Sequence, residues 1–356
     1  MKTFRIHSLL GVWAVVAVIL VIPSCSSRSR LTTEDRISRF ENSLERLQRD
    51  LKIPGMAAVI LEGQQVRWAK GFGYADVEKG IEATPHTPFQ LCSVTKPVAA
   101  MIIHRLVEQG KLDLQTPLID YGIDLDSEGT VRLIHLITHT SQGIPGTQYR
   151  YHGDRYGMLG TALKRETGKS FRTLFVEEVL EPLEMIDSAP NPADPELLER
   201  FFEYRRANGL GQSIRDADGN EWASSDLFDY DDPLWESSIY LAAAMLADYF
   251  DSVGIKKDRF LRYVDKTTDG RTKRDFAEFY TSTNEYLSIY ERLATPYGRD
   301  SEGNMVPDKY SMFFNCAAGL NASVLDIAKF DIALDTDHIV TPPVRENDYR
   351  AFVTTD

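Results

Sequence analysis

The feature that most restricts how this chain can fold is Pro97, which stands directly before an apolar run from Val98 to Val107. Proline has no N–H to donate to the carbonyl four residues back, so a helix tolerates it only in its first turn. Gly110, a residue typical of helix ends, closes the run. The sequence therefore predicts a buried helix with Pro97 in its first turn and Ser93 at or beside its N-terminus, where backbone N–H groups are unpaired.

Ser93 opens the segment Ser93-Val94-Thr95-Lys96, in which a serine and a lysine are three residues apart. Residues at this spacing share one helix face, so the two side chains can meet. A serine hydroxyl is a poor nucleophile near neutral pH and needs a neighbouring base. The lysine can act as that base if burial or nearby positive charge lowers its pKa, or if a tyrosine relays the proton. The Ser93 N–H is placed to stabilise an oxyanion, with help from the helix dipole.

The spacing alone proves little, because about one Ser-x-x-Lys is expected by chance in a chain of this composition. The plain alternatives are an ordinary helix N-cap for Ser93 and a solvated surface lysine for Lys96. The nucleophile hypothesis therefore depends on the helix start at Pro97 and on the surrounding sequence.

Local patterns predict the elements around this helix. Apolar residues from Ile37 to Leu51 recur at spacings of three and four, which indicates an amphipathic helix that starts near Thr33 and ends before Pro54. Two strand-like runs, 56–61 and 65–72, are separated by Glu62-Gly63 and predict a hairpin. Shorter helical stretches are expected at 133–140 and 156–166. Residues 195–290 mix acidic and aromatic residues without strand alternation and read as a mostly helical insertion of unknown role, for which we expect a place at the rim of the site.

The first residues carry an export signal. Lys2 and Arg5 precede an apolar run from Leu9 to Ile22, which is too short to span a bilayer comfortably, so residues 1–24 read as a signal peptide. Ser24-Cys25 resembles a bacterial lipobox, in which Cys25 is acylated; simple cleavage and a retained anchor are the alternatives. Either way we expect an exported protein, and periplasmic attachment through an N-terminal lipid is the favoured form.

The chain has 356 residues, 43% of them apolar, and a net charge of −13. This charge argues against nucleic acid or an anionic membrane surface as the main partner. After processing, the cysteines that stay are Cys92 and Cys316; they could pair, but two buried thiols are the simpler expectation. The sequence points to no cofactor.

Several segments together resemble the serine β-lactamase-related family, which groups class C β-lactamases, D-alanyl-D-alanine carboxypeptidases and related esterases. The match is dense over residues 53–187 and returns at about 293–335. The matching segments, in order, are Ile53-Pro54-Gly55-Met56, Lys70-Gly71-Phe72-Gly73-Tyr74-Ala75-Asp76, Thr84-Pro85, Phe89-Gln90-Leu91-Cys92-Ser93-Val94-Thr95-Lys96, Gly110-Lys111-Leu112-Asp113-Leu114, His135-Leu136-Ile137-Thr138-His139-Thr140-Ser141, Pro182-Leu183-Glu184-Met185, Ala317-Ala318-Gly319-Leu320 and Asp326-Ile327-Ala328-Lys329-Phe330.

The second motif of that family is Tyr-x-Asn, followed by a Tyr and Leu-Leu-Gly. Here Tyr151-His152-Gly153 precedes Tyr156 and Met158-Leu159-Gly160, so the resemblance gives Tyr151 the role of catalytic proton relay. Gly153 replaces the asparagine that holds the lysine and the substrate amide in the family. Its loss weakens the expectation of amide-type substrates such as β-lactams more than that of esters. A packing role within the aromatic stretch is the alternative for Tyr151.

The third motif of the family, Lys-Thr-Gly or His-x-Gly, lies on a strand that supplies the second oxyanion N–H. No such triplet follows Phe330. The strands that would complete the central sheet are also missing, which leaves the 57–72 hairpin with an open edge that natural proteins avoid. We infer a truncated or interrupted version of a longer hydrolase and expect weak or no turnover from the chain as given.

Two other chemistries compete near the site. His135 and His139 are four residues apart, a spacing that would suit a metal on one helix face. No third ligand is evident in the sequence, so no metal is predicted. We expect the two histidines to pack and form hydrogen bonds near the site. Cys92 could be a catalytic thiol, but it has no base spaced for it, so buried packing is expected.

The sequence thus predicts an α/β (α+β) fold of the β-lactamase and penicillin-binding-protein type over residues 31–356, with an antiparallel sheet flanked by helices. The expected reaction is acyl transfer through a Ser93 acyl-enzyme, with Lys96 and Tyr151 handling protons. The expected substrate is a small ester, peptide or lactam. A catalytically impaired binding or regulatory relative and a strict β-lactamase are the alternatives. The sequence leaves open the acyl donor, the oligomeric state and the choice between inner and outer membrane.

Overall fold

The structure is a computed structural model, and it describes residues 31–194, 196–215, 219, 221–223, 234–255 and 268–336. The predicted signal peptide and Cys25 lie outside the described residues. The segment after residue 336 does too, so the structure does not test the prediction about the third motif. Contacts along the chain divide it into two compact units, Met1–Arg46 and Leu47–Asp356.

Helix α2 runs over Thr33–Asp50 and confirms the first predicted helix. The hydroxyl of Thr32 accepts a hydrogen bond from the Asp35 N–H at 3.1 Å, and the Asp35 carboxylate accepts one from the Thr32 N–H at 3.0 Å. Such reciprocal bonds satisfy N–H groups that a helix start leaves without partners. The helix begins at a capped threonine and ends before Pro54, as the sequence indicated.

The predicted hairpin is confirmed: β1 (Gly55–Glu62) and β2 (Gln65–Asp76) pair in antiparallel fashion. Gly63 and Gln64 join them with φ values of 57° and 65°. A tight two-residue hairpin turn requires positive φ at both positions. β3 (Ile81–Glu82) pairs with β2, which gives a three-stranded sheet in the order β1-β2-β3.

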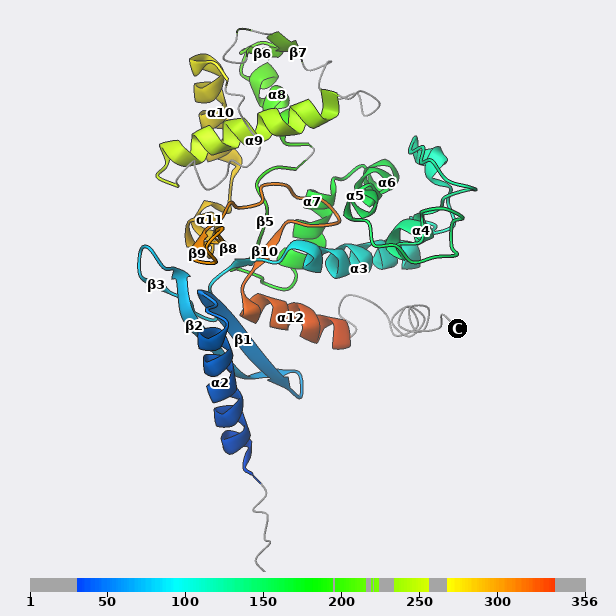
Figure 1. The fold of residues 1–356 in the computed structure, drawn as a ribbon. Helices are drawn as coiled ribbons and strands as arrows, with labels where there is room; N and C mark the ends of the chain where they lie inside the picture. The colour runs from blue at the N-terminus through cyan, green and yellow to red at the C-terminus, as the bar shows by residue number, and fades with distance from the viewer. Residues whose placement is uncertain are drawn as a thin grey trace, which may run out of the picture. The chain divides into compact units, whose positions relative to one another are not determined.

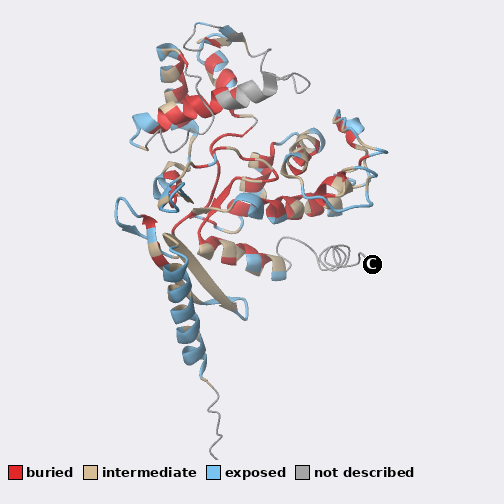
Figure 2. Ribbon diagram, viewed as in Figure 1, coloured by how far each residue is buried: buried red, intermediate tan, exposed pale blue. Residues whose placement is uncertain are grey.

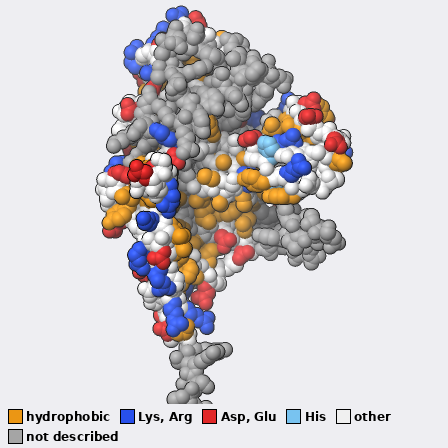
Figure 3. Space-filling view, viewed as in Figure 1, with side chains coloured by type: hydrophobic (Ala, Val, Ile, Leu, Met, Phe, Trp, Pro, Cys, Tyr) orange, Lys and Arg blue, Asp and Glu red, His pale blue; other side chains and the backbone are white. Residues whose placement is uncertain are grey.

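This sheet is thinly covered within the described residues. Helix α12 (Val324–Asp335) packs against β1 and β2 (Figure 1). Even so, β1 is only partly buried along almost its whole length. Hydrophobic side chains are visible at the surface over this part of the molecule (Figure 3). Most of the buried apolar surface therefore lies among the helices.

Helix α3 (Thr95–Glu108) forms the centre of the larger hydrophobic core and has Pro97 as its third residue, in the predicted first turn. Val98, Ile102 and Ile103 on α3 are at most 1% exposed. Figure 2 shows buried stretches, in red, along this helix. Three further helices contribute buried residues to this core: α4 (Leu133–Ile137), α6 (Leu159–Thr167) and α7 (Phe171–Phe175). The prediction of a buried helix is confirmed.

A second small sheet fixes the segment before α3. Its strand order is β4 (Phe89–Gln90), β10 (Leu320–Ala322) and β5 (Ala189–Pro190). The Leu91 N–H donates to the Leu320 carbonyl at 2.8 Å, and the Leu320 N–H donates to the Thr95 hydroxyl at 3.0 Å. These bonds tie the short 3₁₀ turn η1 (Cys92–Val94) to a strand more than two hundred positions later in the chain.

Two predicted helices have different bounds in the structure. The helix expected at 133–140 ends at Ile137, because His139 adopts a left-handed backbone with φ of 55°. The helix expected at 156–166 is divided into α5 (Gly153–Gly157) and α6, and it begins earlier because the His152 side chain accepts a hydrogen bond from the Arg155 N–H. The other short elements of this part are η2 (Leu118–Tyr121), η3 (Val176–Leu180), β8 (Tyr297–Arg299) and β9 (Met305–Pro307).

The described parts of segment 195–290 contain helices with a core of their own. The elements are α8 (Leu197–Ala207), β6 (Ser213–Arg215), β7 (Glu221–Ala223), α9 (Leu234–Ser252), α10 (Gly270–Thr283) and α11 (Leu287–Arg292). Phe201, Phe250 and Phe276 are almost fully buried in this second core. The interpretation of the segment as an insertion stays a prediction. Of the helices that the structure describes, none is both long enough and apolar enough to cross a membrane.

Candidate active site

Ser93 lies in η1, immediately before α3, and its side chain is exposed. Its backbone N–H belongs to the first turn, among the groups that a helix leaves without an internal partner. The Lys96 ammonium donates a hydrogen bond to Ser93 Oγ at 3.0 Å. Lys96 itself is only 7% exposed, so a buried ammonium group lies next to the exposed hydroxyl of Ser93.

Tyr151 meets the same hydroxyl from a different part of the chain. The Tyr151 and Ser93 oxygens are 2.6 Å apart, and Lys96 Nζ lies 4.8 Å from the centre of the Tyr151 ring. The structure therefore brings together all three residues to which the sequence assigned catalysis. The Lys96 ammonium and the Ser93 hydroxyl both favour the phenolate, so the pKa of Tyr151 is held below its usual value of 10.

A carbonyl group that the sequence did not single out also holds Lys96. Lys96 Nζ donates to the Ala317 carbonyl at 2.8 Å. The Asn315 side chain fixes this turn, since its Oδ1 accepts from the N–H groups of Ala317 and Ala318 at 2.8 Å and 3.2 Å. The family resemblance at Ala317-Ala318-Gly319-Leu320 was a signal for this segment, but it assigned no role to the carbonyl.

Tyr156 contacts both the backbone and the side chain of Lys96. Its hydroxyl donates to the Lys96 carbonyl at 3.0 Å, and Lys96 Nζ lies 5.5 Å from its ring centre. Burial raises the pKa of Tyr156 above its usual value, so the hydroxyl stays protonated and can serve as this donor. Lys96 is thus held at both its backbone and its side chain.

Gly153 is the first residue of α5, directly after the capping residue His152. A Cβ atom built at Gly153 would meet no heavy atom within 4 Å. The position at which the family carries asparagine is therefore open space in this protein, and a side chain there would fit.

Comparisons with known proteins show the family and the fold of the chain. The model of the family described as Beta-lactamase matches residues 40–355. The chain belongs to the beta-lactamase family. This family member is 26% identical over 225 residues to the beta-lactamase of Escherichia coli (strain K12), an alignment that covers 55% of this chain and 58% of that enzyme. It is 25% identical over 189 residues to Protein flp of Staphylococcus aureus (strain NCTC 8325 / PS 47), covering 43% of this chain and 38% of that protein.

Solved structures of the same fold cover most of this beta-lactamase family member. One is the octameric penicillin-binding protein homologue from Pyrococcus abyssi, with a TM-score of 0.56 and 21% identity over 87% of this chain and 59% of that one. Another is the D-alanine carboxypeptidase AmpC from Burkholderia cenocepacia, with a TM-score of 0.53 and 16% identity over 88% of this chain and 68% of that one. The predicted family and fold class are confirmed.

The sequence predicted that Cys92 and Cys316 are both buried, and the structure confirms this for Cys316 but not for Cys92. Cys316 is buried, and burial raises its pKa above the usual range. Cys92 is exposed, because the chain enters η1 through a left-handed backbone at this residue, with φ of 47°, outside the core. Both thiols are free, so the alternative of a disulfide between them is not realised.

The two histidines that suggested a metal have other partners. His135 Nδ1 accepts from the Arg132 N–H at 3.1 Å, and His139 Nδ1 accepts from the His152 N–H at 3.2 Å. Across the described part of the chain, no group of three or more His, Cys, Asp or Glu side chains is arranged to hold a metal ion. The imidazoles serve this family member as hydrogen-bond acceptors.

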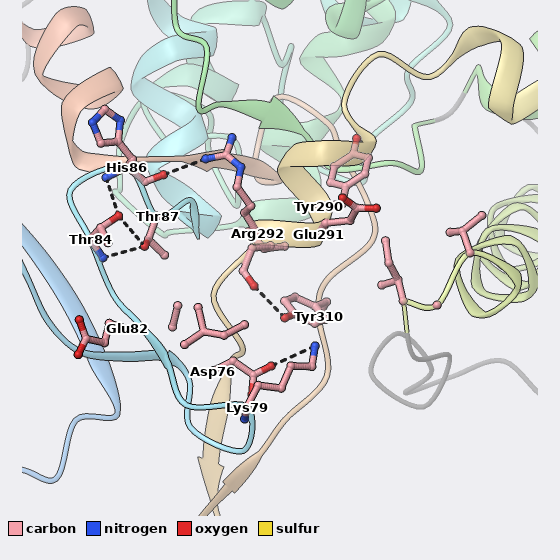
Figure 4. A pocket seen from close by; sticks show the side chains of 16 residues that line it. Asp76, Lys79, Glu82, Thr84, His86, Thr87, Tyr290, Glu291, Arg292 and Tyr310 are labelled. Atoms are coloured by element: carbon pink, nitrogen blue, oxygen red, sulfur yellow. Dashed lines mark hydrogen bonds and ion pairs between the residues drawn. The ribbon is translucent and has the colours of Figure 1, made fainter.

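A cavity of about 420 Å³ lies elsewhere, between the β2–β3 region and the segment around α11 (Figure 4). None of the three candidate catalytic residues lines it. Its charged groups interact with nearby protein groups: Lys79 lies 3.4 Å from the Asp76 carboxylate, and Arg292 donates to the Asp187 carboxylate at 2.8 Å. The candidate catalytic residues therefore lie outside this cavity.

Proposed function

We propose that this protein is a serine hydrolase that transfers acyl groups through an ester on Ser93. The observation that carries the proposal is the position of Ser93 Oγ, 2.6 Å from the Tyr151 oxygen and 3.0 Å from Lys96 Nζ. A nucleophile within hydrogen-bond reach of a base that is itself held by a third group is the usual arrangement for covalent catalysis. Membership of the beta-lactamase family supports this reaction class.

In the first step, Ser93 Oγ attacks the carbonyl carbon of the acyl donor while its proton passes to the Tyr151 oxygen. The carbonyl oxygen becomes an oxyanion, which the Ser93 N–H stabilises from the helix start. The tetrahedral intermediate then collapses, and the leaving group departs with the proton from Tyr151. Water hydrolyses the acyl-enzyme by the same route in reverse, with Tyr151 taking a proton from the water.

Lys96 has an electrostatic role in this proposal. Its ammonium stays fixed between Ser93 Oγ and the Ala317 carbonyl, and it favours the Tyr151 phenolate that the first step requires. A cation in a buried position acts more strongly on its neighbours than one in water, because the effective dielectric is lower.

For the acyl donor we propose an ester in preference to an amide or a lactam. Gly153 has no side chain that could bind the amide of a substrate, and the space beside it is open. The same observation favours a second candidate function, a protein that forms the acyl-enzyme but turns over poorly. Peptide and lactam donors stay within the proposed class because the family includes enzymes that act on them.

The proposal is tested by comparing hydrolysis of a p-nitrophenyl ester and of a chromogenic cephalosporin, together with labelling by a fluorescent fluorophosphonate. Labelling and slow ester hydrolysis without cephalosporin hydrolysis is the expected result. Labelling without turnover would favour the second candidate, and efficient cephalosporin hydrolysis would favour a strict β-lactamase. Absence of labelling at any pH would contradict the serine hydrolase itself.

Changing Gly153 to Asn should increase acylation by a lactam relative to an ester by about fivefold. One added hydrogen bond in the acylation transition state contributes about 1 kcal/mol, which corresponds to a rate factor of this order. A Cβ atom at Gly153 meets no heavy atom within 4 Å, so the first atom of the new side chain has room. The rate of acylation by a fluorescent penicillin and by a p-nitrophenyl ester would be measured on the same preparations.

Gly153→Ala is the matched control, because it fills the same space without a polar group. The two variants should differ in the ratio of lactam to ester acylation. If the ratio is the same in Gly153→Asn, Gly153→Ala and the unchanged protein, this position does not select the substrate.

We also propose that the protein is exported and held at a membrane by a lipid on Cys25. The proposal rests on the sequence of the first residues, where a basic start and an apolar run precede Ser24-Cys25. Changing Cys25 to Ala in the full-length protein should abolish palmitate incorporation. The variant protein should leave the membrane fraction for the soluble fraction, or should retain its uncleaved signal peptide. Incorporation that persists in the Cys25→Ala variant would contradict lipidation at this residue.

A further inference from the structure

His139 lies directly against Tyr151, although the proposed reaction gives it no role. Their ring centres are 4.6 Å apart at an angle of 35°. The same imidazole lies 5.2 Å from the ring centre of Tyr156 and 5.8 Å from that of Tyr149. His139 is only 9% exposed, so its ring forms a buried support for three tyrosines, two of which contact Lys96.

The hydrogen bonds of His139 hold the backbone on both sides of Tyr151. The His139 carbonyl accepts from the Arg150 N–H at 2.8 Å. The His139 ring accepts from the His152 N–H at 3.2 Å through Nδ1. Residues 150 and 152 flank Tyr151 in the sequence, so a single residue fixes the Tyr151 backbone before and after the side chain.

His139 adopts an unusual backbone conformation that accompanies its hydrogen bonds to residues 150 and 152. Its φ of 55° lies in the left-handed region, which costs a non-glycine residue free energy on the order of 1 kcal/mol. This conformation ends α4 and turns the His139 carbonyl and ring toward the same stretch of backbone. Strained residues of this kind persist where the surrounding structure requires them.

Burial does little to hold the Tyr151 side chain in place. Its side chain is 53% exposed, so the hydrophobic core does not fix its position. Its hydroxyl must nevertheless stay within hydrogen-bond distance of Ser93 Oγ for the proposed proton transfer. The contacts with His139 provide the restraint that burial does not.

We propose that His139 is a positioning residue that sets where the Tyr151 hydroxyl lies relative to Ser93 and Lys96. The effect of this positioning on catalysis rests on the proposed function, whereas the positioning of the Tyr151 hydroxyl by His139 does not. The neutral imidazole is the form that can accept from His152, with its own proton on Nε2. Burial, followed by the nearby positive charge of Lys96 and of His152, lowers the pKa of His139 and favours this neutral form.

The test compares His139→Ala with His139→Asn. Asparagine tolerates a positive φ, and its Oδ1 takes the place of Nδ1 as an acceptor for the His152 N–H. Alanine keeps neither property. In His139→Ala we expect the rate constant for fluorophosphonate labelling to fall by about 10- to 100-fold, up to the loss that a misplacement of about 1 Å can cause. His139→Asn should recover a substantial part of this loss.

A second readout reports on Tyr151 without any acylation. Ultraviolet difference titration of each protein against its own Tyr151→Phe derivative gives the pKa of Tyr151 alone. If His139 holds Tyr151 beside Lys96, the Tyr151 pKa should rise toward 10 in His139→Ala and lie between the two values in His139→Asn. Circular dichroism at each pH would restrict the comparison to folded protein.

The outcomes separate the inference from the proposed function. If the unchanged protein is not labelled but the Tyr151 pKa rises in His139→Ala, the serine hydrolase proposal fails and the positioning role holds. If the Tyr151 pKa and the labelling rate of folded protein are unchanged in His139→Ala, the positioning role is overturned, even if the melting temperature falls.

Discussion

Replacing Ser93 by alanine should abolish covalent labelling by a fluorophosphonate and reduce whatever ester hydrolysis the chain shows to the background level. The account assigns bond formation to Ser93 Oγ alone, and alanine has no atom that can replace it. The exposed position of Ser93 means that the fold should tolerate the change, with an effect on stability within about 0.5 kcal/mol. Labelling and hydrolysis would be measured on the same purified protein.

Ser301→Ala, in an exposed turn, is the matched control for the loss of a serine hydroxyl and should behave as the unchanged protein. Cys92 is the neighbouring group that could mislead this experiment, because its thiol is free and exposed. Labelling that survives in Ser93→Ala but disappears in a Cys92→Ala protein would mean that the thiol reacts. In that case the assignment of Ser93 as the nucleophile would be wrong.

Changing Lys96 to Met should lower the rate of Ser93 acylation by about 10³-fold, the upper end of the range for removing one preorganised electrostatic group beside the reacting atoms. Methionine is unbranched, apolar and of similar length, so it suits a position that is only 7% exposed. The change removes the hydrogen bonds to Ser93 Oγ and to the Ala317 carbonyl. The measurement is the single-turnover acylation rate as a function of pH, corrected for the folded fraction.

The basic midpoint of the pH profile of acylation should also move in Lys96→Met, and it should move to higher pH. In the unchanged protein, Lys96 and Ser93 hold the pKa of Tyr151 below 10, so the phenolate base forms at lower pH than in a free tyrosine. Without the ammonium, the Tyr151 pKa rises and the basic midpoint of acylation moves to higher pH. Lys111→Met, at an exposed lysine, is the control. A Lys96→Met profile with the same midpoint and a rate within about threefold of the unchanged protein would show that Lys96 takes no part.

The sequence predicted those features whose causes are local. Pro97 restricted α3 to a start within one turn before it, and Gly63 marked the β1–β2 turn, because proline is excluded from the helix interior and glycine readily adopts a positive φ. The spacing of Ser93 and Lys96 placed their side chains together for the same reason, since three positions along a helix determine which face they share.

The features that the sequence did not predict depend on contacts between distant segments. The carbonyl of Ala317 reaches Lys96 only because β10 lies beside β4, and nothing in the residue type of an alanine marks its backbone as a partner. The exposed side chain of Cys92 and the shortened helix before His139 both follow from left-handed backbones at non-glycine residues, which residue preferences do not indicate.

The most direct test of the central claim is to identify the atom that becomes acylated. The protein would be incubated with a fluorophosphonate, digested and examined by peptide mass spectrometry, with and without prior exposure to a slowly hydrolysed p-nitrophenyl ester. The account predicts a single modified peptide that carries the adduct on Ser93, and less of it after the ester has occupied the site. An adduct on Cys92, Tyr151 or any other residue in place of Ser93, or no adduct at all, would contradict it.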